Sequence, residues 1–268
     1  EDRFFDLIAS SLKSASGTRC GAVLVALDAT GRQRYIEDLR SARNEADFYV
    51  DLMSHDIRNF NQITMGYIEL LQLSDRLSPE DSAYLEKAQK GVTGSNKLID
   101  NIKKVRMIRQ FAGKELKRID LGEILRQDAE AVKKTSAASN IIFSDAVTRE
   151  SRFIMADEYV HEIFRHILEN AVKYDPHEQK LIEVDASETI EHGCPCWLVR
   201  IADNGVGVPD DKKRTIFERI TKTTKGAGLG LSIVNLIVDK YRGRIWVEDK
   251  VKGDPAKGSV FTVQLPRA

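Results

Sequence analysis

Apolar residues recur at heptad spacing over residues 32–74, and this pattern constrains the fold more than any other feature of the chain. With Leu39 at heptad position a, positions a, d and e are mostly apolar through five heptads. The residues concerned are Leu39, Ala46, Met53, Phe60 and Tyr67 at a, Ala42, Tyr49, Asp56, Ile63 and Leu70 at d, and Val50, Ile57 and Leu71 at e. A stripe of this width predicts a long helix in a bundle.

A second long helix is predicted to follow after a short connection. Ser78 is suited to cap it, Pro79 to occupy its first turn, and Asp81 to complete a capping box, and its apolar face extends to about Ile108. Two long helices with a short link predict an antiparallel hairpin. Because two helices cannot cover so wide an apolar face, we expect residues 32–110 to form a homodimer through a four-helix bundle.

The first 31 residues resemble a fragment of a domain. The pattern favours a helix over residues 4–13, a strand over 22–27, and a turn at 28–31. This is too little chain to bury a core of its own.

Composition excludes several classes of function. Apolar residues make up 42% of the chain and charged residues 31%, as in a soluble globular protein. Forty-one basic residues balance forty-one acidic ones, which gives no charge drive toward nucleic acid. No apolar run approaches the roughly 18 residues of a membrane helix, so we expect no membrane contact within this segment. Cys20, Cys194 and Cys196 form neither a zinc pattern nor an even set of disulfides, which favours reduced thiols and a cytoplasmic location.

Beyond a polar linker at 111–118, residues 119–268 predict an α/β domain. Helices are expected at 121–134, 157–174 and 229–241. Strands are expected at 141–143, 152–155, 181–186, 197–202, 244–248 and 259–265. Strands grouped with few long crossovers indicate a mixed or antiparallel sheet. The expected fold class is therefore multidomain, an antiparallel helical hairpin followed by an α/β sandwich with a mixed sheet.

Three side chains near the end of the helix predicted at 157–174 share one face. His166, Asn170 and Lys173 are spaced i, i+4 and i+7. An Asn oxygen can help to hold Mg²⁺ beside phosphates, and a Lys offers them a positive charge. Taken alone, the trio is more typical of a solvated helix face.

Asp203 follows the strand predicted at 197–202, and Gly205 and Gly207 come directly after it. Glycines permit a tight backbone path with little side-chain bulk. A carboxylate at the edge of such a pocket can accept a hydrogen bond from an exocyclic amine such as that of adenine. Asp-Asn-Gly is also an ordinary turn sequence.

A glycine-rich segment precedes the helix predicted at 229–241. Gly226, Gly228 and Gly230 leave backbone amides and a helix N-terminus open to anions, without the spacing of a Rossmann fingerprint or a P-loop. The preceding stretch, from Pro209 to Lys225, is rich in Lys, Arg and Thr. It has the composition of a lid over phosphates and also that of a solvated loop.

Five short motifs resemble, in the same order, those of the sensor histidine kinases. They are Ser-His-Asp-Ile-Arg-Asn at 54–59 (H-box), His-Ile-Leu-Glu-Asn-Ala-Val-Lys-Tyr at 166–174 (N-box), Asp-Asn-Gly-Val-Gly at 203–207 (G1), Ile-Phe-Glu at 216–218 (F-box) and Gly-Ala-Gly-Leu-Gly-Leu at 226–231 (G2). The resemblance covers residues 36–266. It implies a dimerising phosphoacceptor hairpin and an ATP-binding domain of the Bergerat type, shared with gyrase, Hsp90 and MutL. The stretch at 25–33 resembles the last strand and exit of a PAS sensor domain.

The resemblance implies roles in the predicted hairpin. His55 would be the phosphorylated residue and Asp56 the acidic neighbour that helps as a base. His55 falls at heptad position c, opposite the apolar seam, where a second domain can reach it. Asn59, four residues on, occupies the position of a Thr or Asn that accompanies phosphatase activity toward a response regulator.

The resemblance also implies roles around the nucleotide. Asn170 would bind Mg²⁺, Lys173 and Tyr174 would contact the nucleotide, and Asp203 would contact adenine. The remaining cofactor-binding residues implied are Gly205, Gly207, Lys225, Gly226, Gly228, Leu229 and Gly230.

Two positions depart from the family pattern. Phe60 stands where a proline usually follows the H-box. His166 stands four residues before Asn170, where relatives that hydrolyse ATP carry a Glu base. The expectation is an ATP- and Mg²⁺-dependent histidine kinase that phosphorylates His55 and passes the phosphoryl group to a response regulator aspartate. The alternatives are a Bergerat-type ATPase that drives conformational change, which His166 disfavours, and a non-catalytic nucleotide-binding scaffold.

Overall fold

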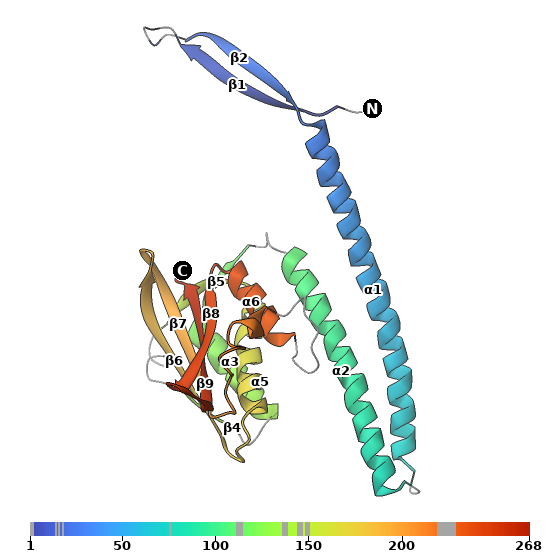
Figure 1. The fold of residues 1–268 in the computed structure, drawn as a ribbon. Helices are drawn as coiled ribbons and strands as arrows, with labels where there is room; N and C mark the ends of the chain where they lie inside the picture. Colours follow the sequence, from blue (N-terminus) through green and yellow to red (C-terminus); the bar gives the residue numbers. More distant parts are fainter. Residues whose placement is uncertain are drawn as a thin grey trace. The chain divides into compact units, whose positions relative to one another are not determined.

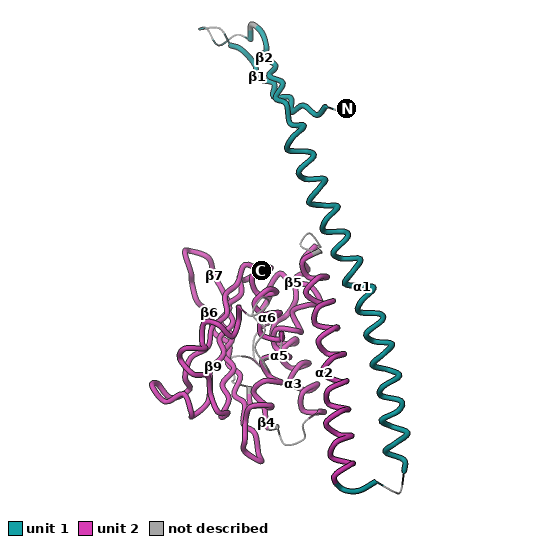
Figure 2. The backbone as a smooth tube through the Cα atoms, turned by 45° about the vertical axis from the view of Figure 1, so that its right-hand side comes forward, with its two compact units in different colours: residues 1–79 teal, residues 80–268 magenta. Residues whose placement is uncertain are grey.

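The computed structural model describes residues 3–13, 15, 17, 19–74, 77–110, 115–135, 139–143, 147, 151–218 and 229–268. The chain divides into two compact units, residues 1–79 and 80–268 (Figure 2). In the described part of the chain, no helix carries an apolar stretch that could span a lipid bilayer.

The first unit opens with an antiparallel hairpin of β1 (Phe5–Lys13) and β2 (Arg19–Asp28). The strand predicted at 22–27 is confirmed, but the helix predicted at 4–13 is wrong. The backbone of this segment pairs with β2 in a register that sets Phe5 opposite Asp28. An apolar run this short does not distinguish a helix from a strand by its periodicity, and pairing with the neighbouring segment decides the outcome.

The first predicted long helix is confirmed as α1 (Thr30–Gln72). Its start is tied to the hairpin, because the Ala29 N–H donates to the Phe4 carbonyl at 2.9 Å. The Arg32 guanidinium also lies 2.6 Å from a carboxylate oxygen of Asp6.

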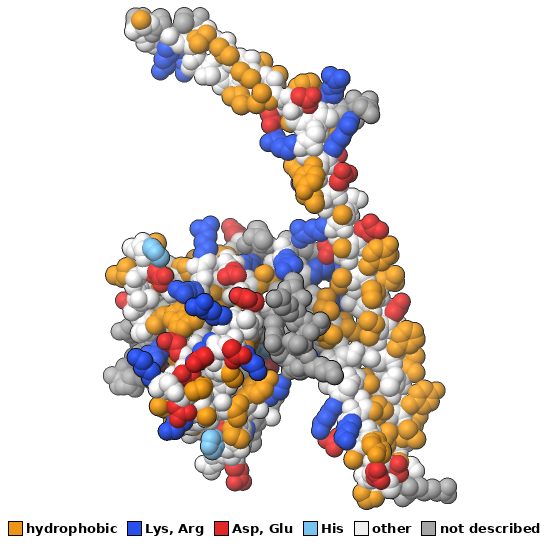
Figure 3. All heavy atoms as spheres, in the orientation of Figure 1, with side chains coloured by type: hydrophobic (Ala, Val, Ile, Leu, Met, Phe, Trp, Pro, Cys, Tyr) orange, Lys and Arg blue, Asp and Glu red, His pale blue; other side chains and the backbone are white. Residues whose placement is uncertain are grey.

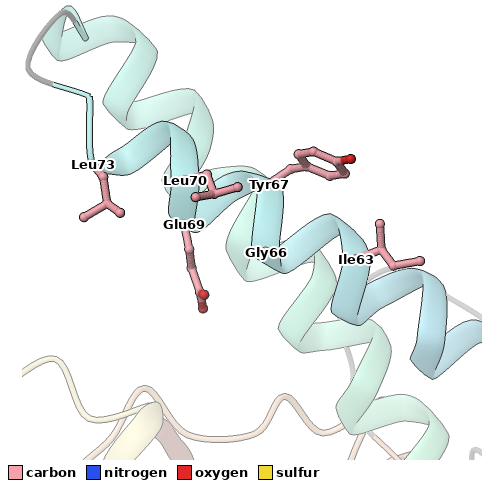
Figure 4. A pocket seen from close by; sticks show the side chains of 6 residues that line it. All are labelled: Ile63, Gly66, Tyr67, Glu69, Leu70 and Leu73. Atoms are coloured by element: carbon pink, nitrogen blue, oxygen red, sulfur yellow. The ribbon is translucent and has the colours of Figure 1, made fainter.

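The apolar stripe of α1 is largely exposed in the single chain. Met53, Phe60 and Tyr67, all at heptad position a, are 61%, 69% and 66% exposed. Orange side chains follow α1 in Figure 3. Toward the C-terminal end of α1, Ile63, Tyr67 and Leu70 line a shallow groove with Leu73 (Figure 4). Apolar surface of this extent marks an interaction site.

The second predicted long helix is α2 (Pro79–Gln110), which begins at Pro79 as expected. Its C-terminal end packs on the second unit's core, where Ile108 is buried and Val105 is half-buried. The next element is β3 (Lys117–Asp120), whose first two residues belong to the predicted linker. The predicted domain boundaries remain a prediction.

The second unit is built on a five-stranded sheet of order β4-β6-β7-β9-β8. Its strands are β4 (Ser139–Phe143), β6 (Lys180–Glu191), β7 (Cys194–Ala202), β8 (Arg244–Val251) and β9 (Asp254–Pro266). β4 pairs with β6 in parallel and the other pairs are antiparallel, so the predicted mixed sheet is confirmed. A second, two-stranded sheet pairs β3 with β5 (Phe153–Ala156).

Three helices cover the same side of the sheet: α3 (Leu121–Thr135), α5 (Val160–Lys173) and α6 (Gly230–Lys240) (Figure 1). The stripe of α5 is fully buried at Ile163, Phe164 and Ile167. These side chains join Val199 and Val263 of the sheet in one core. The apolar periodicity of α5 thereby determines which face of the helix packs on the core. The other side of α5 contributes to the site described below.

The hairpin of β6 and β7 is longer than predicted. Its turn consists of His192 and Gly193, with φ of 50° and 81°. Two residues with positive φ fit the right-handed twist of a tight hairpin. The strands therefore pair up to Glu191 and Cys194.

Candidate functional site

The C-terminal end of α5 presents Asn170 at the edge of the core. Its carbonyl oxygen accepts the Tyr174 N–H at 3.0 Å, which ends the helix. Asn170 is half-buried, and its side-chain amide has no hydrogen bond within the described residues. The amide oxygen is therefore available to a ligand at this edge.

Lys173 and Tyr174 lie beside Asn170 on the exposed side. The Lys173 ammonium is 3.3 Å from the Tyr174 hydroxyl and 4.9 Å from the centre of its ring. Tyr174 is 46% exposed. The pair offers a positive charge and an aromatic face to a bound molecule.

Asp203 lies just beyond the end of β7 and is buried. One carboxylate oxygen, Oδ1, accepts the Gly205 N–H at 2.8 Å and the Ser259 N–H at 3.1 Å. No described residue bonds the other oxygen, Oδ2. Burial raises the pKa of the Asp203 carboxyl above its ordinary value, opposed by the two N–H donors, and the nearby Asp175 raises it further. One oxygen thus holds the loop in place while the other can accept from a ligand.

The glycines after Asp203 allow the backbone to approach its neighbours closely. A Cβ on Gly205 would stand 2.9 Å from the Tyr174 carbonyl oxygen. Gly207 has a φ of +70°, and a Cβ there would overlap the Pro255 carbonyl. On the other side, Gly258 has a φ of +102° and passes against the backbone of Asp203. At Gly207 and Gly258, only glycine satisfies both the positive φ and the close approach.

His166 does not lie on a solvated face, in contrast to the simplest interpretation of its spacing. It is buried, and a Cβ on Gly230 would stand 3.1 Å from its Nδ1. Its Nε2 is 3.3 Å from a carboxylate oxygen of Glu162. The Lys104 ammonium lies 2.9 Å from both oxygens of Glu162. The His166 contact, opposed by burial and reinforced by Lys104, lowers the pKa of Glu162 to about 2.

The predicted lid is described only in part. Phe217, in the short 3₁₀ helix Thr215–Phe217, is buried with its ring edge-on to Phe261, the centroids 6.3 Å apart. Lys213 lies 2.5 Å from Asp210 and 2.6 Å from Asp249. The start of the segment is therefore anchored to the domain. Lys225, Gly226 and Gly228 lie outside the described residues, whereas Leu229 and Gly230 form the start of α6.

His55 belongs to the first unit and projects from α1 with its side chain 71% exposed. Its Nδ1 lies 3.0 Å from Oδ1 of Asp56. The Asn59 side-chain nitrogen lies 3.4 Å from Nδ1 and 3.5 Å from Nε2 of the same ring, at the outer limit of hydrogen bonding. The structure thus brings the three residues together.

Sequence reasoning missed several residues of the nucleotide region. Ser259 and Gly258 support Asp203 from β9, and Glu162 and Lys104 hold His166. Gly258 could have been identified from the sequence, because a glycine within a strand suggests close backbone approach. Among the described residues, no three His, Cys, Asp or Glu side chains converge to hold a metal ion on their own.

Comparison with known proteins identifies the second half of the chain. Residues 156–268 match the family described as histidine kinase-, DNA gyrase B- and HSP90-like ATPase. The adaptive-response sensory kinase SasA of Synechocystis sp. is 27% identical over 246 residues, which cover 86% of this chain and 61% of that protein. The chain spans less than two thirds of the length of this relative.

Solved structures show the same architecture. Full-length ShkA, solved in complex with AMPPNP, is 27% identical, with a TM-score of 0.60 over 82% of this chain and 46% of that one. The histidine kinase ThkA, solved in complex with the response regulator protein TrrA, is 21% identical, with a TM-score of 0.53 over 100% of this chain and 76% of that one. At that identity the second likeness concerns the fold alone.

A pair of glycine substitutions tests the close approach at the G1 loop. Gly207→Ala should destabilise folding through a left-handed residue, at about 1–2 kcal/mol, and overlap with Pro255, at about 1–3 kcal/mol more. Gly193→Ala is the control, because its φ of +81° is similar but a Cβ there meets nothing within 4 Å. Urea unfolding measures both. Equal losses in the two variants would contradict the packing described for Gly207.

Proposed function

This chain belongs to the sensor histidine kinase family, and we propose that it uses ATP to phosphorylate its own His55. The observation that carries the proposal is the hydrogen bonding of the Asp203 carboxylate. One oxygen accepts two backbone N–H groups, and the other is open to an adenine amine. The exocyclic amine of adenine donates hydrogen bonds, which suits a carboxylate oxygen at the pocket edge that has no donor of its own.

The rest of the nucleotide pocket is assigned from the same region. Lys173 would meet the phosphates, and Tyr174 would line the pocket beside it. Asn170 would help to hold Mg²⁺, because its amide oxygen is accessible and Mg²⁺ takes oxygen ligands from protein and phosphates together. Bound Mg²⁺ would neutralise charge on the phosphates during transfer.

The acceptor is assigned from the geometry on α1. With Asp56 at Nδ1, the tautomer protonated on that nitrogen is favoured, and Nε2 keeps its lone pair. Nε2 would attack the γ-phosphorus, the bond to the β,γ-bridging oxygen would break, and ADP would leave. The Nδ1 proton would pass to Asp56, which neutralises the charge on the ring.

The partner of the phosphorylated protein is proposed to be a response regulator. Phosphohistidine is a reactive donor, and an aspartate of a receiver domain would accept the group. ThkA, a relative in fold, was solved with a response regulator. The exposure of His55, 71% of its side chain, suits access by a second protein.

The first variant, His55→Gln, separates chemistry from binding. We expect no transfer of label from γ-³²P ATP into the protein, since the nucleophile is gone. ATP affinity should stay within about twofold by calorimetry, because His55 lies in a different unit from the nucleotide residues. His192→Gln, at an exposed turn, is the control and should incorporate the ³²P label as the wild type does. Label retained in His55→Gln would sink the assignment.

The second variant, Asp203→Asn, tests the adenine contact. Loss of a charge-assisted hydrogen bond should weaken ATP binding by about 1.5–3 kcal/mol. Glu188→Gln, which alters an exposed carboxylate paired with Arg267, is the control and should bind as the wild type does. Calorimetry that gives Asp203→Asn an unchanged affinity would count against the pocket.

We further propose a homodimer through residues 32–110, with the exposed stripe of α1 as the seam. Phe60→Glu places a charge at a seam position that is 69% exposed in the single chain, and it should dissociate or unfold the dimer. Gln62→Glu, two residues away at heptad position c, is the control and should remain dimeric. Light scattering that finds a wild-type monomer at micromolar concentration would refute the seam.

A second activity, phosphatase action on the regulator, is favoured by the place of Asn59. Its amide lies beside the His55 ring, where it could aim a water at a phosphoaspartate docked on α1. Asn59→Ala should therefore slow dephosphorylation of independently phosphorylated regulator about tenfold or more, while autophosphorylation continues. Equal phosphatase rates in the variant and the wild type would end this proposal.

A further inference from the structure

His166 is a buried polar side chain with contacts on both sides. Its ring packs against the backbone of Gly230, where a Cβ would stand 3.1 Å from Nδ1 and 3.5 Å from Cε1. On the other side, Nε2 lies 3.3 Å from Glu162, within ion-pair range but beyond a well-formed hydrogen bond. The imidazole therefore fills the space between α5 and the first residue of α6.

Glu162 is held in turn by a residue of α2. Its two oxygens each lie 2.9 Å from the Lys104 ammonium, and its side chain is only 16% exposed. A partly buried ion pair is screened less by solvent than a surface pair and fixes its members in one geometry. Lys104, Glu162 and His166 thus form a continuous row of contacts from α2 to the start of α6.

This row of contacts ends at the N-terminus of α6. Leu229 and Gly230 open α6, and backbone amides at a helix N-terminus are suited to phosphate. Their position against α5 is set by the ring of His166, since the glycine at 230 brings the two helices close together. A movement of the ring would therefore move these amides.

We propose that His166 is a positioning residue that fixes the start of α6 for the phosphates of the nucleotide, and that Lys104 and Glu162 hold its ring in place. This inference rests on the proposed function. It assigns His166 a role distinct from that of the Glu base of ATP-hydrolysing relatives: His166 acts through the backbone of Gly230 and does not touch the reacting atoms. It also makes the phosphate end of the pocket depend on a residue of α2.

The first test compares ligands with and without phosphates in the full chain. His166→Ala should weaken binding of Mg·AMPPNP about tenfold and leave binding of adenosine within about twofold, because adenosine is held at Asp203. His161→Ala is the control: His161 lies earlier on α5 and contacts Asp128 on α3. It should change neither affinity by more than about twofold. His166→Gln, which keeps a nitrogen able to reach Glu162, should recover part of the loss.

The second test is a double-mutant cycle between the two packed residues. Gly230→Ala should weaken Mg·AMPPNP binding about fivefold in the wild type, where the new methyl group meets the ring of His166. In the His166→Ala background the methyl group has space, and the further loss should be less than about twofold. As a single substitution, Lys104→Gln should weaken Mg·AMPPNP binding. In the His166→Ala background it should cause little further loss of affinity.

The outcomes separate the inference from the proposed function. Equal weakening of adenosine and Mg·AMPPNP by His166→Ala would show a general structural role and overturn the inference. Additive effects of Gly230→Ala and His166→Ala would overturn it as well, and an irreversibly misfolded fraction of one variant would lower the calorimetric stoichiometry without changing the affinity. A wild-type chain that binds neither ligand would instead overturn the proposed function.

Discussion

The nucleotide region depends on one carboxylate oxygen. Oδ1 of Asp203 accepts an N–H from Gly205, in the loop after β7, and another from Ser259, in β9. A buried carboxylate is tolerated because these donors compensate for lost solvation. These two hydrogen bonds hold the loop against the sheet. The backbone approaches closely at Gly205, Gly207 and Gly258 as a result. If Oδ1 were unpaired, neither the loop path nor the orientation of Oδ2 would be defined.

Strong local periodicity made much of the fold predictable. The heptad stripe predicted α1, and the apolar stripe at Ile163, Phe164 and Ile167 predicted α5, because apolar residues that recur with the period of a helix indicate a helix with one apolar face. Segments without such a pattern were misjudged or missed. The segment 4–13 became β1 because it pairs with β2, and β3 exists because Lys117–Asp120 pairs with β5, which the sequence around either segment does not reveal.

In the candidate site, too, the residues of the motifs were predicted and their tertiary contacts were not. The motifs around His55, Asn170 and Asp203 were identified by their resemblance to those of the sensor histidine kinases, yet their partners depend on tertiary structure. Ser259 lies 56 residues from Asp203, and Lys104 lies 58 residues from Glu162. The burial of His166 is another such case, since its spacing with Asn170 and Lys173 suggested a solvated face, and only the packing of α6 on α5 turns its ring inward.

The central claim is that the chain carries a phosphoryl group on a histidine of α1. The most direct measurement is peptide mass spectrometry, under neutral or alkaline conditions that preserve phosphohistidine, of wild-type protein incubated with Mg·ATP. The account predicts phosphate on the peptide that contains His55, and localised to that residue. Release of ADP and inorganic phosphate with no modified histidine would contradict it and favour an ATPase that drives conformational change.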